Sequence, residues 1–322
     1  MDSPPLPTLP PRPIDGHKGT FRTVGIIAGS CGSGGEPNDR AARMLGAPAL
    51  VAMGANRSGC GLVKIASPEP ILSAVLTLAP FATGYPIAVA EDQQIDPTDA
   101  MTVFDRLASE SDALVIGPGL GTGAPIEQLI HHAIHSSNTD RLGGLVIDAD
   151  GITALCQSGD LNALKNAQPP FPIVLTPHPG EAIRLANALS IEIDPAGSDE
   201  QRLDACSQIA QVLNAIVVLK GHHTVVADSS RQWVCQHGHP CLGVGGTGDV
   251  LAGMIGSLLA QGAGQSDPTH TIAPFDRVCI AVQAHAQSGQ RWAELHDADG
   301  GMDPRDLGDQ IPAVLSGYRS PH

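Results

Sequence analysis

The stretch GGTGDVLAGMIGSLLAQ, residues 245–261, joins a glycine-rich turn to a helical pattern of apolar residues. One helix face carries Leu251, Met254, Ile255, Leu258 and Leu259. This spacing predicts a helix over Val250–Gln261, so the glycines come just before a helix N-terminus, where free N–H groups and the helix dipole attract anions. Asp249 can accept a proton from an attacking hydroxyl there, or it can simply cap the helix while the glycines turn the chain.

Short apolar runs on either side of this stretch predict strands buried on both faces of a sheet. The predicted strands are Val24–Ala28, Leu62–Ala66, Ala113–Ile116, Gly144–Ile147, Ile173–Leu175 and Ile216–Leu219. The predicted helices are Ala47–Arg57, Pro70–Leu78, Pro125–His135, Gly180–Leu189, Arg202–Leu213, Val250–Gln261 and Pro274–Leu295. Because strands and helices alternate, we expect an α/β fold with a mostly parallel sheet, and residues 219–238 predict two antiparallel strands near its edge.

The composition of the chain limits which partners and which cellular compartment we expect. The 322 residues carry a net charge of −15, and protonating all 13 histidines would still leave about −2, so nucleic acid is a poor partner. No apolar run is long enough to span a membrane. Seven scattered cysteines without a CxxC pair favour thiols in a reducing cytoplasm. We expect a flexible, proline-rich arm over residues 1–16 and one domain over residues 17–318.

Residues that directly follow the predicted strands are the functional candidates, because ligands of open α/β sheets bind beyond the carboxyl ends of the strands. These positions are Gly29–Ser30, Gly117–Gly121, Asp148–Asp150, Thr176–Glu181, Lys220–Gly221 and Gly245–Asp249. The chain has no GxxxxGK[ST] pattern, and Gly29–Gly35 lacks a clean dinucleotide fingerprint. The sequence therefore disfavours a P-loop NTPase and a classical Rossmann dehydrogenase.

Taken together, the motifs resemble those of the ribokinase-like family of NAD(P)H-hydrate dehydratases. They occur in the family's order from residue 17 to residue 253. In this chain they read HKG (17–19), GS (29–30), GAPALVAMGANRSGCGLVKIA (46–66), IGPGLG (116–121), VIDAD (146–150), LTPHPGE (175–181), VVLKG (217–221) and GGTGDVLAG (245–253). The resemblance implies a three-layer ribokinase-like fold, with helices on both faces of a mostly parallel sheet that has antiparallel edge strands.

The resemblance also implies a reaction. ADP or ATP, with Mg²⁺, would phosphorylate the C6 hydroxyl of (S)-NADHX or (S)-NADPHX, and phosphate elimination would restore NADH or NADPH. Asp249 would be the general base, and the amides of Gly246, Thr247 and Gly248 would hold the transferring phosphoryl group. The implied substrate contacts are Ala47, Gly119, His178 and Asp249. The implied nucleotide contacts are Lys220, Gly221, His222, His223, Thr224 and Gly248.

Most of these residues also have a purely structural interpretation. Ala47 could be a small residue at a close helix contact, Gly119 a turn residue, and Lys220 a lysine that extends from a buried strand toward water. His178, between two prolines at the start of a helix, favours a functional role. Asp148 and Asp150 could bind the metal, directly or through water, or one could cap a helix. His131, His132 and His135 lack the carboxylates that would complete a metal site, and indicate a solvated face.

The family resemblance further implies a separate epimerase acting upstream and a homo-oligomer, often a tetramer. Three departures from the family pattern stand out: the long segment 31–45, the pair His222–His223 where smaller residues are common, and Gly151–Thr153 in place of Ala-Leu-Asn. Two other functions share the same motifs. A ribokinase-like small-molecule kinase would stop at a stable phosphorylated product, and a nucleotide sensor would bind without turnover.

Overall fold

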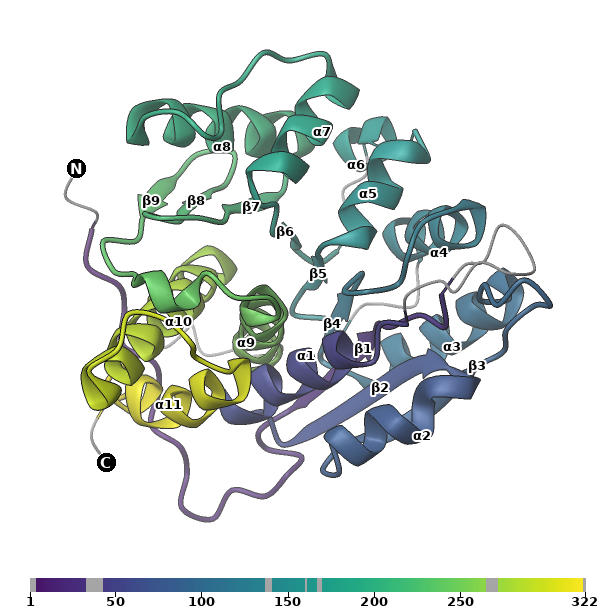
Figure 1. The fold of residues 1–322 in the computed structure, drawn as a ribbon, viewed down its shortest axis with the longest axis horizontal. Coiled ribbons are helices and arrows are strands. Elements are labelled where there is room, and N and C mark those ends of the chain that lie inside the picture. Colours follow the sequence, from purple (N-terminus) through teal and green to yellow (C-terminus); the bar gives the residue numbers. More distant parts are fainter. Residues whose placement is uncertain are drawn as a thin grey trace.

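Alternate residues of the strands point to opposite faces of a central sheet, and each face is covered by its own helices (Figure 1). In the first strand, Val24 and Ile26 belong to one apolar core, whereas Ile27 belongs to the other. This period of two is what a strand buried on both faces requires. The computed structural model describes residues 4–32, 43–136, 141–159, 161–166, 170–264 and 272–320. Within these ranges the fold has three layers, helices, sheet and helices.

The described residues form a nine-stranded sheet in the order β3-β2-β1-β4-β5-β6-β7-β8-β9. The strands are β1 (Thr23–Ile27), β2 (Leu62–Pro68), β3 (Thr83–Ile87), β4 (Ala113–Ile116), β5 (Leu145–Ile147), β6 (Ile173–Leu175), β7 (Ile216–Leu219), β8 (Val225–Ala227) and β9 (Gln232–Val234). Pairings from β3 through β7 are parallel, and β8 and β9 pair antiparallel at one edge. The predicted mixed sheet is confirmed.

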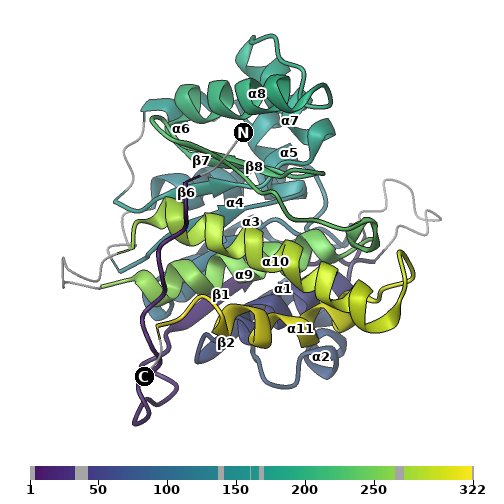
Figure 2. The ribbon, with the colours of Figure 1, turned by 90° about the vertical axis from the view of Figure 1, so that its left-hand side faces the viewer.

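Two sets of helices form the outer layers. One core lies under α1 (Gly46–Arg57), α2 (Glu69–Leu78), α9 (Thr247–Gly262), α10 (Pro274–His296) and α11 (Pro304–Ser316). The other lies under α3 (Pro97–Glu110), α4 (Ala124–His135), α5 (Asp150–Gln157), α6 (Leu161–Asn166), α7 (Pro179–Leu189) and α8 (Asp199–Leu213). The view in Figure 2 shows α9, α10 and α11 together on one side of the sheet.

The sequence missed several elements, each for a local reason. Edge strand β3 has the sequence TGYPI, and its glycine and proline argue against a strand. Both are tolerated at the edge of a sheet, where a strand pairs on one side only. Helix α3 begins at Pro97 after an Asp96 cap, but its sequence PTDAMTVFDRLASE is rich in polar and charged residues. Helices α5 and α6 are short, and α11 contains Pro312, which normally argues against a helix interior. These four helices were not predicted.

Close packing of α1 against α9 positions the glycine-rich turn that precedes α9. A Cβ added to Gly253 of α9 would lie 2.0 Å from the carbonyl oxygen of Val51, and one added to Gly54 of α1 would lie 2.2 Å from that of Val250. Neither helix can carry a larger residue at these points without moving. The two backbones therefore fix where the N-terminus of α9 sits relative to the sheet.

The N-terminal arm was expected to be a flexible, extended lead-in. Leu9 is instead buried, its N–H donates to the carbonyl of Tyr318, and Ser320 donates back to the carbonyl of Leu9. Figure 2 shows the arm running past the C-terminal segment. In the described residues this part of the arm is extended but docked, because Leu9 is buried in the core and Leu6 packs against it.

Candidate active site

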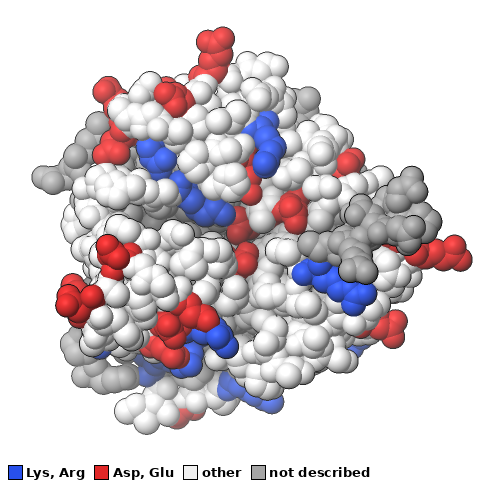
Figure 3. Space-filling view, viewed as in Figure 1, with Lys and Arg blue, Asp and Glu red and all other residues white. Residues whose placement is uncertain are grey.

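The candidate site lies where the sheet order reverses. Strand β1 is flanked by β2 and β4, so the connections leave its carboxyl end in opposite directions and open a crevice there. The turn after β1 is tied to the loop after β4, since the Gly29 N–H donates to the carbonyl of Pro118 at 2.9 Å. Figure 3 shows acidic and basic side chains meeting near the centre of this face.

The N-terminus of α9 presents its free amides without any side-chain cap. Its N-cap, Gly246, has φ 97°, a left-handed conformation that suits glycine, and makes no side-chain cap hydrogen bond. The hydroxyl of Thr247 lies 2.9 Å from the carbonyl of Leu242 and 3.0 Å from that of Val244, so it holds the turn rather than facing a ligand. The backbone N–H groups of this first turn are left to bind an anion.

A buried histidine supports this turn from behind. The Nε2 of His285, on α10, lies 2.9 Å from the carbonyl oxygen of Thr247. Burial lowers the pKa of His285 to about 4, so the ring is neutral at physiological pH and must carry its proton on Nε2 to donate this bond. His285 therefore acts as a positioning residue for the α9 turn. His285 was not among the predicted site residues, because an isolated histidine within a helix carries no motif.

Lys220 and Asp148 form an ion pair inside the crevice. The Nζ of Lys220, at the end of β7, lies 2.7 Å from Oδ1 of Asp148, at the end of β5. A Cβ placed on Gly248 would lie 3.5 Å from the same Nζ, so the ammonium also stands beside the first turn of α9. Burial lowers the pKa of Lys220, but the carboxylates of Asp148, Glu181 and Asp249 outweigh it and the net shift is upward. Lys220 therefore stays charged.

Asp249 has the electrostatics of a general base. Burial raises its pKa, Asp148 and Asp150 raise it further, Lys220 lowers it, and the result is about 7. A carboxylate with a pKa near the working pH can both take and release a proton during turnover. Asp249 is the group best suited to deprotonate a hydroxyl placed at the N-terminus of α9.

His178 and Glu181 interlock at the start of α7. The Nδ1 of His178 accepts a hydrogen bond from the N–H of Gly180, and Glu181 Oε2 accepts one from the N–H of His178. His178 is thus the N-cap of α7, and its ring is half exposed on the crevice side of the sheet. Glu181 is 5% exposed, and burial raises the pKa of its carboxyl. The TPHPGE motif contained Glu181, but the sequence analysis assigned it no role.

Ala47 and Gly119, two predicted substrate contacts, lie together beside the crevice. A Cβ on Gly119 would lie 3.1 Å from the Cβ of Ala47, which joins the loop after β4 to the first turn of α1. A neighbouring cavity of about 190 Å³ is lined by Ser30, Gly121 and Asp150 among others. Most of the predicted segment 31–45 lies outside the described residues.

The loop after β5 is held in an unusual backbone conformation. Ala149 has φ 51°, which is rare for a residue with a side chain. One aspartate precedes it and another follows it, Asp148 and Asp150. Its N–H donates to Oδ1 of Asp148, and Oδ2 of Asp150 accepts from the N–H of Gly121. Both predicted metal candidates therefore already have protein partners. The described residues contain no group of three or more metal-ligating side chains.

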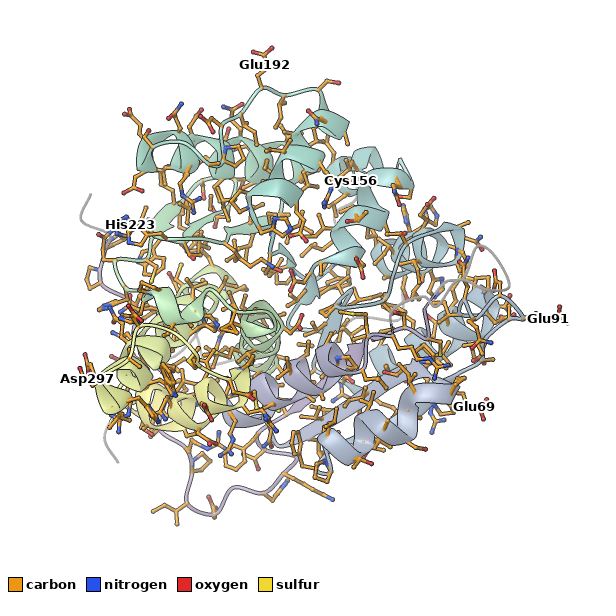
Figure 4. All side chains as sticks on the ribbon, viewed as in Figure 1. Glu69, Glu91, Cys156, Glu192, His223 and Asp297 are labelled. Carbon is orange, nitrogen blue, oxygen red and sulfur yellow. The ribbon has the colours of Figure 1, made fainter. Side chains whose placement is uncertain are left out.

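A second cavity, of about 530 Å³, opens on the other side of the α9 turn. It is lined by five of the six predicted nucleotide contacts: Lys220, Gly221, His222, Thr224 and, from α9, Gly248. His223 does not line it, because its Nδ1 lies 2.8 Å from Asp199, and Figure 4 shows it near the β8–β9 side of the molecule. His237 and His239 line the cavity as well and were not predicted.

The three histidines of α4 each contact another side chain. His131 and His135 stack on each other with ring centroids 4.3 Å apart, and His132 pairs with Asp105 at 2.8 Å. The interpretation as a solvated helix face agrees with the exposure of the two stacked rings.

A search of the described helices for a membrane span found none with the length and apolar character that it would need.

The sheet order and the three-layer arrangement define a protein of the ribokinase-like fold class. A solved ribokinase-like superfamily protein of Enterococcus faecalis has this fold, with a TM-score of 0.72 at 23% identity over 98% of this chain and 93% of its own. A family model described as NAD(P)H-hydrate dehydratase matches residues 41–313. The chain belongs to the NAD(P)H-hydrate dehydratase family.

Individual relatives agree with this assignment. An ADP-dependent (S)-NAD(P)H-hydrate dehydratase of Neisseria meningitidis is 36% identical over 85% of this chain and 78% of its own length. A bifunctional NAD(P)H-hydrate repair enzyme of Salinibacter ruber is 33% identical over 95% of this chain, which spans 50% of that relative. The Bacillus subtilis ADP/ATP-dependent dehydratase, co-crystallised with ATP and Mg²⁺, has a TM-score of 0.70 at 26% identity over 98% and 99% of the two chains.

Proposed function

We propose that this chain uses ADP or ATP to dehydrate (S)-NADHX or (S)-NADPHX to NADH or NADPH. The observation that carries the proposal is Asp249, a carboxyl with a pKa of about 7 in the first turn of a helix whose amides carry no side-chain cap. The relative from Neisseria meningitidis carries the same activity in its name. The cavity of about 530 Å³ is the nucleotide site, and Ala47, Gly119 and His178 contact the hydrated dinucleotide.

In this mechanism Asp249 takes the proton of the C6 hydroxyl as that oxygen attacks the terminal phosphoryl group. The amides of Gly246, Thr247 and Gly248 hold the phosphoryl oxygens, and Lys220 offers a positive charge next to them. The P–O bond to the nucleotide breaks in this transfer, and the nucleotide leaves with one phosphate fewer. The C6–O bond then breaks as the lone pair of the ring nitrogen pushes out the phosphate, and loss of a proton from C5 restores the C5=C6 double bond. A phosphate is a far better leaving group than hydroxide, which is why a nucleotide is consumed.

Mg²⁺ fits this site as a partner of the nucleotide rather than as an ion held by protein alone. Asp148, Glu181 and Asp249 outnumber Lys220, so the crevice carries surplus negative charge that suits a dication. Asp148 and Asp150, directly or through water, would hold the ion together with nucleotide phosphates. When bound, Mg²⁺ neutralises the phosphate charge. The solved relative from Bacillus subtilis was crystallised with ATP and Mg²⁺.

The cellular setting belongs to the same proposal. The seven cysteines are all free thiols, which suits a reducing cytoplasm. A separate NAD(P)HX epimerase would act upstream and supply the S epimer. We further propose one catalytic domain over residues 17–318 and a homo-oligomer, with a tetramer as the family-based expectation.

The test is recovery of dihydronicotinamide absorbance from (S)-NADHX with Mg²⁺ and either ADP or ATP. The wild type should show nucleotide-dependent recovery, and Asp249→Asn should lose it. Asp306→Asn is the matched control, because Asp306 also lies in the first turn of a helix, α11, and should leave the rate unchanged. Accumulation of a stable phosphorylated product would favour a small-molecule kinase, and nucleotide binding without turnover would favour a sensor. Either result would overturn the proposal.

A further inference from the structure

A separate cavity lies at the opposite end of α9 from Asp249. It has a volume of about 230 Å³ and is lined by residues 9–13, Thr20, Phe21, Gln261, Arg277 and Arg319. Gln261 is twelve positions after Asp249 on the helix, which corresponds to about 18 Å along its axis. The cavity is therefore distinct from the candidate active site. We call it the arm cavity, because the N-terminal arm forms one of its walls.

Three arginines line the arm cavity, and its lining includes no aspartate or glutamate. Arg12 comes from the arm, Arg277 from α10 and Arg319 from the C-terminal segment. This cluster is positively charged, although the whole chain has a net charge of −15. Segments far apart in the sequence bring these like charges together around one cavity.

Arg12 and Arg319 donate their hydrogen bonds to neutral groups. Arg12 Nη1 donates to the carbonyl of Gly59 at 2.7 Å, and its guanidinium stacks on the Phe21 ring 3.6 Å from the centroid. Arg319 donates from Nη1 to the carbonyl of Pro10 and from Nη2 to Oε1 of Gln261, both at 3.1 Å. Within the described ranges neither arginine is ion-paired. Since a guanidinium has five N–H donors, both keep donors for a further partner.

The like charges are close enough to perturb one another. Burial, together with the charge of Arg12, lowers the pKa of Arg319 to about 10. Burial also lowers the pKa of Arg277 to about 10, with Arg319 adding to the effect. All three side chains remain cationic at neutral pH. A bound anion would relieve the repulsion, and paired N–H donors of arginine match the geometry of a phosphate oxyanion.

We propose that the arm cavity binds a phosphate oxyanion, through Arg12 and Arg319, and that the bound anion fastens the N-terminal arm to the C-terminal segment. The volume admits a single phosphate group. That group can come from free orthophosphate or from a small phosphate monoester, because both present the same oxygens. The bound anion bridges a residue of the arm to a residue more than 300 positions later, so it should stabilise the fold.

The experiment measures melting temperature and affinity. Thermal unfolding of the full chain is followed against potassium phosphate, against glycerol 3-phosphate, and against potassium chloride at equal ionic strength. Saturating ADP is present throughout, so that phosphate cannot act through the nucleotide site. Isothermal titration calorimetry with orthophosphate gives the dissociation constant directly. The variants are Arg12→Gln, Arg319→Gln and Arg319→Lys, and the control is Arg106→Gln, an exposed arginine of α3.

We expect a saturable rise in melting temperature with phosphate beyond the effect of chloride. The dissociation constant for phosphate should rise at least tenfold in Arg12→Gln and Arg319→Gln. It should rise less in Arg319→Lys, which keeps the charge, and should not change in Arg106→Gln. A response to orthophosphate alone would identify the free anion as the ligand, and an equal or larger response to glycerol 3-phosphate would identify a monoester. The proposal is overturned if the wild type responds no more to phosphate than to chloride. Equal phosphate affinity in Arg319→Lys and the wild type, together with no loss in Arg12→Gln, would also overturn it.

Discussion

Replacing Asp249 by asparagine should make the protein more stable while it abolishes activity. The carboxyl has a pKa of about 7 in the folded chain against an ordinary value of 3.8, so folding disfavours its charged form. Its contribution to stability is fully present below pH 4 and is lost as the pH rises to 7. Asparagine cannot ionise, so the variant avoids this loss.

The size of the effect follows from the shift. Three pKa units correspond to about 4 kcal/mol at 1.36 kcal/mol per unit. Asp249 is only partly buried, and Lys220 compensates part of its charge, so we expect about 2 kcal/mol. The gain should be near zero at pH 4 and should reach its full value above pH 7.

The assay is urea-induced unfolding of wild type and Asp249→Asn at pH 5 and pH 8, with Asp306→Asn as the control. The difference between wild type and Asp249→Asn should be larger at pH 8 than at pH 5, and Asp306→Asn should show no such dependence. An Asp249→Asn variant that is equally stable or less stable than the wild type at pH 8 would refute the argument that burial raises this pKa. The same pKa predicts that wild-type kcat/KM falls about tenfold per pH unit below pH 7.

Three further substitutions test the supports of the site. Lys220→Met should weaken nucleotide binding at least tenfold in calorimetry, because it removes the charge beside the α9 turn and leaves Asp148 without its ion pair; unchanged affinity would contradict this role. Gly253→Ala should lower stability by about 1 to 3 kcal/mol in urea unfolding, since its Cβ would meet the carbonyl of Val51 at 2.0 Å, and a neutral effect would mean that α1 and α9 separate freely. His285→Leu should lower kcat about tenfold with a smaller change in KM, because the Thr247 carbonyl loses its hydrogen-bond donor. Steady-state kinetics measure both constants, and a loss confined to KM would contradict this role.

Local patterns predicted most of the sheet and the centre of the site. The runs that became β1, β2 and β4 to β7 are mostly apolar, so their burial on both faces could be predicted without tertiary information. The pattern at residues 245–261 placed Asp249 in the first turn of a helix, and the structure has α9 begin at Thr247. By contrast, β3 and α11 were missed because proline and glycine are tolerated there only in their particular tertiary positions, one at a sheet edge and one on the protein surface.

The sequence by itself determined the alternation of strands and helices, and therefore which residues follow each strand. Those residues had to meet at one edge of the sheet, since the strands from β3 to β7 are parallel. Only the tertiary structure decided the electrostatics. The pKa of Asp249, the Lys220–Asp148 pair and the support from His285 depend on burial and on distances between segments far apart in the chain. Desolvation and Coulomb interactions act through space, so no pattern along the chain can reveal them.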